Sequence, residues 1–401
     1  MAENSWHKPV ENDTRNITRT KLLMVFDHFY PGYKAGGPIQ SLANLVVLLE
    51  DSYDITVISS AYDLQSKEAY PNILIDGWNS VQLPGTNKPI KIWYAGKGKP
   101  GKRLYALLFK EIDPSVVYLN GMFSYHYLLL PLLVLHKRKT NIRVIVCPRG
   151  MLQAGALALK ATKKKAYLKW LKLSGLLKQV SWHATNDEEK NDIRKVFGNR
   201  QIIRIAYNVP KKPLENLLQV KKERGILRLV YLSLIAEKKN LLQLIEVVSN
   251  SGSGVVLDIY GPAKDLEYWE QCKILINRNP GKVKYMGEAR PEKVQQIFSN
   301  YDASILLTRG ENFGHALYES LSAARPVITS YFTPWKELEN KKAGWNVDIS
   351  DTKSISKLLN RLCHLNTNSF DEYCRGAHLL SMAYFSSAAE QQQYNELFEV
   401  A

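Results

Sequence analysis

Residues 311–319 read Glu-Asn-Phe-Gly-His-Ala-Leu-Tyr-Glu and carry two carboxylates eight positions apart. The residues just before them, 303–308 (ASILLT), form a short apolar run that predicts a buried strand. The residues after Gly314 form an apolar, helix-prone run. A strand, a glycine turn and a helix in this order present backbone N–H groups to an anion. We therefore predict an anion-binding loop that holds Glu311, with Glu319 about two turns into the helix.

The alternation of strand and helix continues on both sides of this stretch. In the first half of the chain, apolar runs followed by helical patterns predict strands at residues 21–27, 55–59, 116–119, 142–146 and 180–184. In the second half, the same pattern predicts strands at residues 227–232, 255–260, 282–285, 303–307 and 326–330. Such alternation is typical of parallel, doubly wound sheets. We predict an α/β protein with two Rossmann-like domains, whose ligands bind in a central cleft beyond the carboxyl ends of the strands.

The length of 401 residues favours two domains. Residues 1–19 are polar and of mixed charge, which predicts a flexible tail without a signal peptide. Residues 20–207 and 208–380 are the predicted domains, and the stretch between residues 207 and 225, rich in Lys and Pro, is the predicted linker. The remaining residues, 381–401, are predicted to be helical, with the helix beginning near Ala377.

The cysteines and the apolar runs exclude several protein classes. Cys147, Cys272, Cys363 and Cys374 are far apart and form no Cys-x-x-Cys pair. This spacing argues against a zinc site and a disulfide scaffold, and suits a reducing compartment. The longest apolar run, residues 128–135, is much shorter than the roughly 20 residues that a membrane-spanning helix needs.

The positive charge of the chain is concentrated in its first half. The formal net charge is +16, and residues 20–207 contain 27 Lys and Arg against 13 Asp and Glu. Residues 114–186 contain no acidic residue, and within them residues 160–178 predict a basic helix with Leu, Tyr and Trp interleaved. Such a helix can lie on an anionic membrane surface, although a solvated basic face is the alternative. The whole acid-free stretch indicates an anionic partner, either a membrane or a phosphorylated substrate.

Three further loop motifs follow predicted strands. Gly36-Gly37 precedes a helix beginning at Pro38, and paired glycines let the backbone approach a diphosphate, although a tight turn is the alternative. Lys239 follows the first strand of the second half and can neutralise a phosphate. Gly261 and Gly287 follow the next two strands, where a nucleotide base can lie.

In this order the motifs resemble the retaining glycosyltransferases of family 4, in their bacterial surface-polysaccharide branch. Residues 311–319 match the E-x7-E pattern of that family, and residues 30–40, 148–152 and 331–338 are also similar. The resemblance covers nearly the whole chain past residue 20. It implies the GT-B architecture and a hexosyltransferase that uses a UDP- or GDP-sugar as co-substrate, with no other cofactor.

The resemblance also implies roles for individual residues. Glu311 contacts hydroxyls of the donor sugar, and Glu319 contacts the nucleotide ribose. The loop between them holds sugar and phosphate, chiefly through backbone N–H groups, with Asn312, Phe313, Gly314 and His315 as its members. Gly36 and Gly37 lie under the donor phosphates.

The sequence departs from the family pattern at two places. The family usually has an arginine five residues before the lysine that matches Lys239, whereas Leu234 stands there. Lys238, Lys34 and Arg309 are the candidate substitutes. Many relatives have a histidine after the strand matching residues 142–146, whereas Arg149 lies in this region. Arg149 is then a surface residue, or it faces the acceptor or the donor phosphates.

The predicted catalytic residues are Glu311, Lys239 and Arg149. Negative charge builds on the departing diphosphate, and Lys239 together with helix N-termini can stabilise it. The chain has no Asp-x-Asp motif, so we predict no metal site.

The resemblance gives the basic first domain a function as the acceptor side. We expect a lipid-diphosphate-linked saccharide as acceptor, and a cytoplasmic enzyme peripheral to the inner face of the membrane, acting in capsule or O-antigen biosynthesis. Relatives send their C-terminal helix back to the first domain, which is expected here for residues 381–401; a helix on its own domain is the alternative. A sugar-nucleotide epimerase of the same fold remains open. A nucleic-acid-binding protein would explain the charge, but not the two glutamates.

Overall fold

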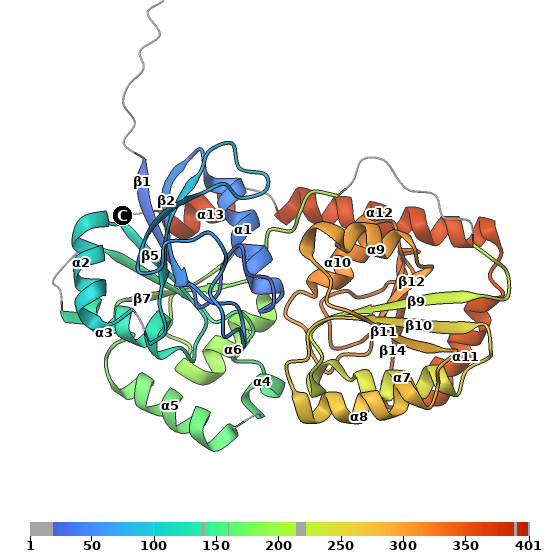
Figure 1. Cartoon of the computed structure of the whole chain (residues 1–401). Coiled ribbons are helices and arrows are strands. Elements are labelled where there is room, and N and C mark those ends of the chain that lie inside the picture. The colour runs from blue at the N-terminus through green and yellow to red at the C-terminus, as the bar shows by residue number, and fades with distance from the viewer. Residues whose placement is uncertain are drawn as a thin grey trace, which may run out of the picture.

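The computed structural model describes residues 19–98, 100–137, 141–158, 160–213, 222–388 and 391–399. It consists of two α/β halves that lie side by side (Figure 1). Each half is built around its own sheet, and helices cover the faces of both sheets. The predicted tail, apart from Arg19, and much of the predicted linker fall outside the described residues.

The first half contains an eight-stranded sheet with the order β3-β4-β2-β1-β5-β6-β7-β8. Its strands are β1 (Thr20–Val25), β2 (Tyr53–Ser60), β3 (Gly77–Val81), β4 (Ile90–Ala95), β5 (Val116–Asn120), β6 (Arg143–Cys147), β7 (Val180–Ala184) and β8 (Ile203–Ile205). Only β3 runs antiparallel to its described neighbour. The connected helices are α1 (Gly37–Leu49), α2 (Lys102–Ile112), α3 (Leu130–Lys137), α4 (Ala154–Ala158), α5 (Ala161–Leu173) and α6 (Asp187–Phe197). The order reverses on the two sides of β1, and such a switch point opens a crevice at the carboxyl ends of the strands.

The second half contains a six-stranded parallel sheet with the order β11-β10-β9-β12-β13-β14. Its strands are β9 (Leu227–Leu232), β10 (Val255–Tyr260), β11 (Val283–Gly287), β12 (Ala303–Leu306), β13 (Val327–Ser330) and β14 (Gly344–Val347). The helices between and after them are α7 (Leu241–Ser249), α8 (Leu266–Asn277), α9 (Val294–Ser299), α10 (His315–Ser322) and α11 (Thr352–Cys363). The order reverses here between β9 and β12, so this sheet has a switch point of its own.

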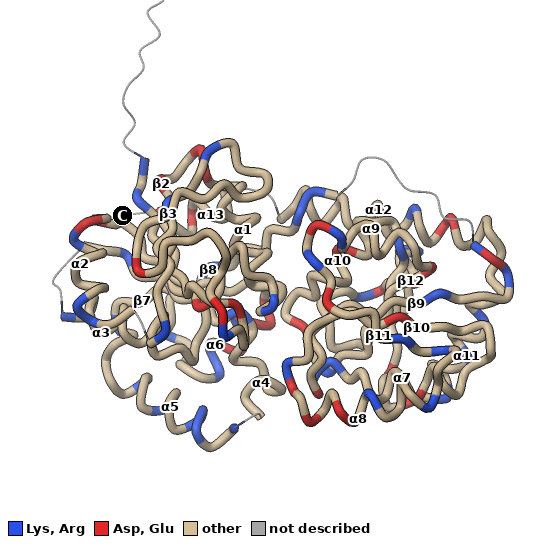
Figure 2. The backbone as a smooth tube through the Cα atoms, viewed as in Figure 1, with Lys and Arg blue, Asp and Glu red and all other residues tan. Residues whose placement is uncertain are grey.

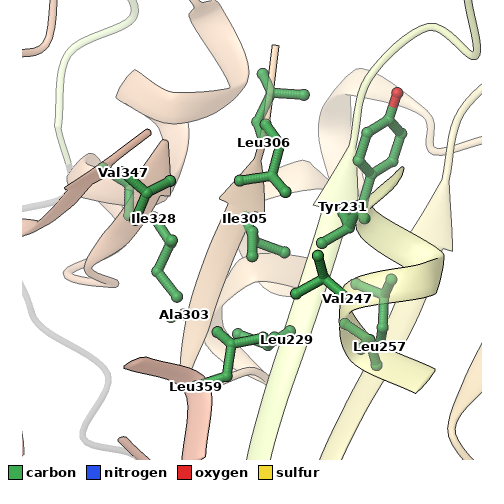
Figure 3. Close-up of a cluster of buried hydrophobic side chains, with 14 of the residues drawn as sticks. Leu229, Tyr231, Val247, Leu257, Ala303, Ile305, Leu306, Ile328, Val347 and Leu359 are labelled. Carbon is green, nitrogen blue, oxygen red and sulfur yellow. The ribbon is translucent and has the colours of Figure 1, made fainter. Parts of the chain in front are cut away.

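Apolar side chains from neighbouring strands form the core of the second half (Figure 3). Leu229, Leu257 and Ile305 come from three adjacent strands and are fully or almost fully buried. Val247 of α7 and Leu359 of α11 pack in the same cluster. Continuous apolar strands buried on both faces are what a parallel sheet between helix layers requires. The predicted fold class, two Rossmann-like sheets, is therefore confirmed.

The last two helices connect the halves in the reverse direction. α12 (Thr367–Ala388) lies along the second half, and α13 (Gln391–Phe398) lies against the first (Figure 1). Tyr394, Leu397 and Phe398 belong to the hydrophobic core beneath the first sheet. The single helix predicted from residue 377 is wrong in its bounds, since α12 already begins at Thr367. Within the described ranges, no helix combines the length and the apolar character that crossing a bilayer requires.

Candidate active site

A cleft lies between the two halves, at the carboxyl ends of strands from both sheets. The first half contributes the loop before α1, the residues after β6 and Asn208. The second half contributes the loops after β9 and β10 and most of residues 311–319. Both switch points thus border one cavity, as the sequence predicted for a two-domain α/β protein.

The two glutamates of the opening motif both line this cleft. Glu311 lies in the loop between β12 and α10, and its backbone N–H donates to Phe332 O at 2.9 Å. Gly314 has φ +80°, a left-handed conformation that glycine adopts without strain, and α10 begins at the next residue. Glu319 is therefore just over one turn into α10, closer to the N-terminus of the helix than the predicted two turns.

Glu311 forms an ion pair with Lys239. Lys239 is the last residue of a single 3₁₀ turn, Glu237–Lys239, that follows β9. Both partners line the cleft and both side chains are mostly buried. The pair brings a cation and a carboxylate together from the loops that follow the adjacent strands β9 and β12.

Glu319 is in a different electrostatic environment. Burial raises the pKa of its carboxyl group to about 7, and the charge of Lys211 only partly opposes this rise. The side chain keeps limited exposure because it faces the cleft. Near neutral pH a large fraction of the unliganded protein therefore carries Glu319 in its protonated form.

The loop that carries Glu311 is anchored by aromatic side chains. Trp335 Nε1 donates to Phe313 O at 2.7 Å, and the rings of Phe313 and Trp335 are 5.5 Å apart. Tyr384 of α12 lies 5.0 Å from the Phe313 ring. Phe313 is buried at the wall of the cleft, so its side chain helps to hold the loop in place.

His315 joins the halves at the start of α10. Its Nε2 atom is hydrogen-bonded to Ser41 Oγ of α1 at 2.7 Å. A Cβ atom at Gly37 would lie 2.4 Å from His315 Cδ2, so only glycine fits there in this arrangement. Burial, helped by the charges of Arg149 and Lys239, lowers the pKa of His315 to about 3, so the imidazole is neutral.

Asn312 makes a second contact between the halves. Its side-chain amide donates to Thr185 Oγ1 at 2.8 Å, and its backbone oxygen accepts from Asn186 Nδ2 at 2.9 Å. A Cβ atom at Gly150 would lie 2.9 Å from Asn312 Cβ. The loop that carries Glu311 and Asn312 is thus closely packed on the first half.

Arg149 is 8% exposed, so its interpretation as a surface residue is wrong. Its guanidinium donates to Asn120 Oδ1 at 2.9 Å, Asn208 Oδ1 at 2.7 Å and Tyr118 Oη at 2.9 Å. These partners are uncharged, and the side chain lines the cleft. His183 continues the network, because its Nε2 donates to Ala206 O and its Nδ1 then accepts from the Tyr118 hydroxyl at 2.6 Å.

The predicted glycines occupy different positions relative to the cleft. Gly36, Gly37 and Gly261 line it. Gly261 has φ +140°, and a Cβ atom there would lie 1.9 Å from Ser233 O, so glycine is needed where β9 and β10 end. Gly287 does not line the cleft; it ends the edge strand β11, and its carbonyl accepts from Gly261 N at 2.9 Å. Its expected contact with the donor is not supported by this position.

Several cleft residues escaped the sequence analysis. Ser41, Gln153 and Asn208 line the cleft, and Thr185 and Asn186 hold its loop, yet each is an isolated polar residue in an ordinary context. Only their arrangement in space identifies them. In the part of the chain that the structure describes, no three His, Cys, Asp or Glu side chains gather into a metal-binding group.

Residues 217–375 match the family model described as Glycosyl transferases group 1. The matched segment contains the cleft residues that the second half contributes, including Lys239, Glu311 and Glu319. A search of curated protein sequences found no match.

Solved glycosyltransferase structures share the fold over nearly the whole chain. Sucrose-phosphate synthase from Thermosynechococcus elongatus superimposes with a TM-score of 0.72 at 14% identity, covering 96% of this chain and 100% of that one. HepE from Anabaena, in complex with UDP and glucose, gives a TM-score of 0.69 at 14% identity, covering 96% of this chain and 100% of that one. WaaG, a glycosyltransferase involved in lipopolysaccharide biosynthesis, gives a TM-score of 0.62 at 12% identity, covering 93% of this chain and 98% of that one. The fold of this chain is that of the GT-B glycosyltransferases.

Proposed function

We propose that this protein is a retaining hexosyltransferase that moves a sugar from a UDP- or GDP-sugar to a saccharide acceptor. One observation carries the proposal: a single cleft joins the Gly36-Gly37 loop of one half to the Lys239–Glu311 ion pair and Glu319 of the other. These groups suit the phosphates, the sugar and the ribose of a nucleotide sugar. The match of residues 217–375 to a glycosyltransferase family model supports the same reaction class.

The chemistry follows from where charge develops. When the bond between sugar C1 and the phosphate oxygen breaks, its electrons move onto the diphosphate and positive charge builds on the sugar ring. Lys239 and the N–H groups at the start of α10 can stabilise the diphosphate. Glu311 can accept hydrogen bonds from sugar hydroxyls while its contact with Lys239 orients it. Because protein cations can balance the diphosphate, we propose that transfer does not need a metal.

Glu319 suits the ribose. An ionised carboxylate can accept hydrogen bonds from two neighbouring hydroxyl groups. Those donors favour the ionised form, so donor binding should lower the pKa of Glu319 from its raised value in the unliganded cleft.

The first half suits an anionic acceptor at a membrane. α5 carries exposed lysines together with Trp170, 47% exposed, and Leu173, 75% exposed. Figure 2 shows Lys along α5 with no acidic residue, whereas acidic residues appear at α6. We propose that α5 rests on the anionic inner face of the membrane and brings the cleft to a lipid-diphosphate-linked saccharide in surface-polysaccharide synthesis. The involvement of WaaG in lipopolysaccharide biosynthesis is consistent with this function.

The test is a panel of UDP-, GDP- and ADP-sugars incubated with saccharide acceptors, with and without a metal chelator. We expect transfer of one sugar with its anomeric configuration retained, as read by NMR, at an unchanged rate with chelator. Formation of an altered nucleotide sugar without acceptor would instead identify an epimerase. Failure of every nucleotide sugar to bind would refute the proposal.

A further inference from the structure

Three cationic side chains line the cleft among the described residues, and they differ in their partners. Lys239 is paired with the Glu311 carboxylate. Arg149 is held by uncharged oxygens on the wall formed by the first half. Lys238, which precedes Lys239 in the 3₁₀ turn, has a third kind of environment.

Lys238 is a largely buried cation with one uncharged partner. Its Nζ donates to Gln153 Oε1 of the first half at 3.1 Å, and no described carboxylate oxygen lies within 4.0 Å of it. A Cβ atom at Gly310 would lie 3.2 Å from Lys238 Cε and 3.6 Å from Nζ. The ammonium group therefore lies beside the backbone that leads into Glu311. Burial in the cleft also lowers the pKa of Lys238, as expected for a cation whose charge is not fully compensated.

Two of the other nearby cations are engaged elsewhere, and a third, Lys264, whose charge helps to lower the pKa of Lys238, does not line the cleft. Lys34 forms an ion pair with Glu288 at 3.2 Å. Arg309 forms one with Glu237 at 3.2 Å, and its exposed side chain does not line the cleft. Leu234 does line the cleft but carries no charge; its Cδ1 atom would lie 3.7 Å from a Cβ atom at Gly36.

A diphosphate needs more positive charge than Lys239 supplies. Glu311 already balances Lys239, so that pair adds little net charge, whereas the diphosphate gains charge as the sugar leaves. We propose that Lys238 is the second cation that binds the donor diphosphate, exchanging the amide oxygen of Gln153 for a phosphate oxygen when the donor enters. This inference rests on the proposed function and adds a donor-binding residue to it.

The test compares nucleoside diphosphates with monophosphates. We would titrate the full chain with UDP and UMP, and with GDP and GMP, by calorimetry. Lys238→Met should weaken binding of the preferred diphosphate about 10- to 100-fold, the usual effect of losing a charge-assisted hydrogen bond, and leave the monophosphate within about threefold. Lys238→Arg should retain most of the affinity. Arg309→Ala, which removes a charge just outside the cleft, is the matched control and should bind as the unmodified chain does.

A rescue variant separates charge from structure. Leu234→Arg in the Lys238→Met background places a cation beside the Gly36 loop and should restore part of the diphosphate affinity. Equal affinity of Lys238→Met and the unmodified chain for the diphosphate would overturn the inference. So would an equal loss for diphosphate and monophosphate, which indicates damage to the cleft as a whole. If the unmodified chain binds no nucleoside diphosphate, the proposed function itself fails.

Discussion

At the scale of single residues, Glu319 links the site to stability. The pKa of its carboxyl group is about 7 in the folded chain, against 4.5 for the free group. Between these values the unfolded chain releases its proton first, so the free energy of unfolding falls as the pH rises from about 4.5 to about 7. This difference in pKa corresponds to a change of at most about 3 kcal/mol in the free energy of unfolding, and water in the cleft makes the change smaller.

Replacing Glu319 tests this linkage. The side chain in Glu319→Gln cannot ionise, so the free energy of unfolding of this variant should rise relative to that of the unmodified chain between pH 5 and pH 8. Its transfer activity should drop strongly. Urea unfolding without ligand at both pH values measures the difference. Parallel stability profiles for the two proteins would show that Glu319 titrates normally.

Glu311 allows a prediction that separates sugar from phosphate. Glu311→Gln removes the charge that we propose accepts hydrogen bonds from the sugar hydroxyls, so kcat/KM should fall about 10- to 100-fold. The same change frees the charge of Lys239, so binding of the nucleoside diphosphate alone should be as tight as before or tighter. Glu237→Gln, an exposed carboxylate in the neighbouring turn, is the control for both assays. Weaker diphosphate binding by Glu311→Gln would contradict this assignment.

The residues of the donor loop could be predicted because strand, glycine and paired acids follow one another in the chain. The environment of Arg149 could not be predicted in the same way. Its partners Asn120 and Asn208 come from distant segments, and only the fold brings their oxygens to one guanidinium. Gly287 was predicted from its place directly after a strand, but that strand is at the edge of the sheet and Gly287 does not line the cleft.

At the scale of elements, the contact between the Gly36-Gly37 loop and α10 fixes the position of the two halves relative to each other. Gly37→Ala would place a methyl group 2.4 Å from the His315 ring, so the loop and helix must separate. We expect weaker donor binding and a lower kcat with little loss of fold. Gly281→Ala meets no atom within 4 Å and serves as the control. Calorimetry with the nucleotide sugar measures the effect; unchanged affinity in Gly37→Ala would show that the loop adapts.

Ten parallel strands, five in each sheet, were predictable because each is an apolar run followed by a helical pattern. Four strands were missed: β4 is an apolar run (IKIWYA) that the sequence analysis overlooked, and the other three lack this signal. β3 and β14 mix Gly, Trp and Asn with few aliphatic residues, and β8 is very short. The early start of α12 was hidden by Gly376, which usually indicates a helix break. Here a Cβ atom would lie 2.2 Å from Lys342 O, so the glycine permits close packing inside the helix.

At the scale of the whole molecule, the basic first half should direct the protein to anionic lipid. Replacing Lys163, Lys165 and Lys169 of α5 with Gln should weaken binding to anionic vesicles in a sedimentation assay by up to about 100-fold, since each lysine near the surface contributes about 1 kcal/mol. The control replaces three exposed lysines of the second half with Gln: Lys336, Lys353 and Lys357. It has the same net charge as the α5 variant and should bind anionic vesicles nearly as well as the unmodified chain. Equal binding of the unmodified chain to neutral and anionic vesicles would contradict the proposed surface.

Two leucines test how much the packing of α13 on the first half contributes to stability. Leu397 is fully buried on α13, whereas Leu379 on α12 is 67% exposed. Leu397→Ala should lower the free energy of unfolding by about 2–5 kcal/mol. Leu379→Ala should change it by less than about 0.5 kcal/mol. Urea unfolding measures both, and similar values would show that α13 contributes little to the core.

The position of α13 also bears on how the protein is made. In most multidomain chains the N-terminal domain folds first, while the ribosome is still synthesising the rest. Here the core of the first half contains Tyr394, Leu397 and Phe398, which are synthesised after the second half. The second half holds most of its core residues earlier in the sequence and can fold before the first half is complete. The part of the chain synthesised first should therefore be the last to reach its native packing, and it must keep its apolar surface from aggregating until then.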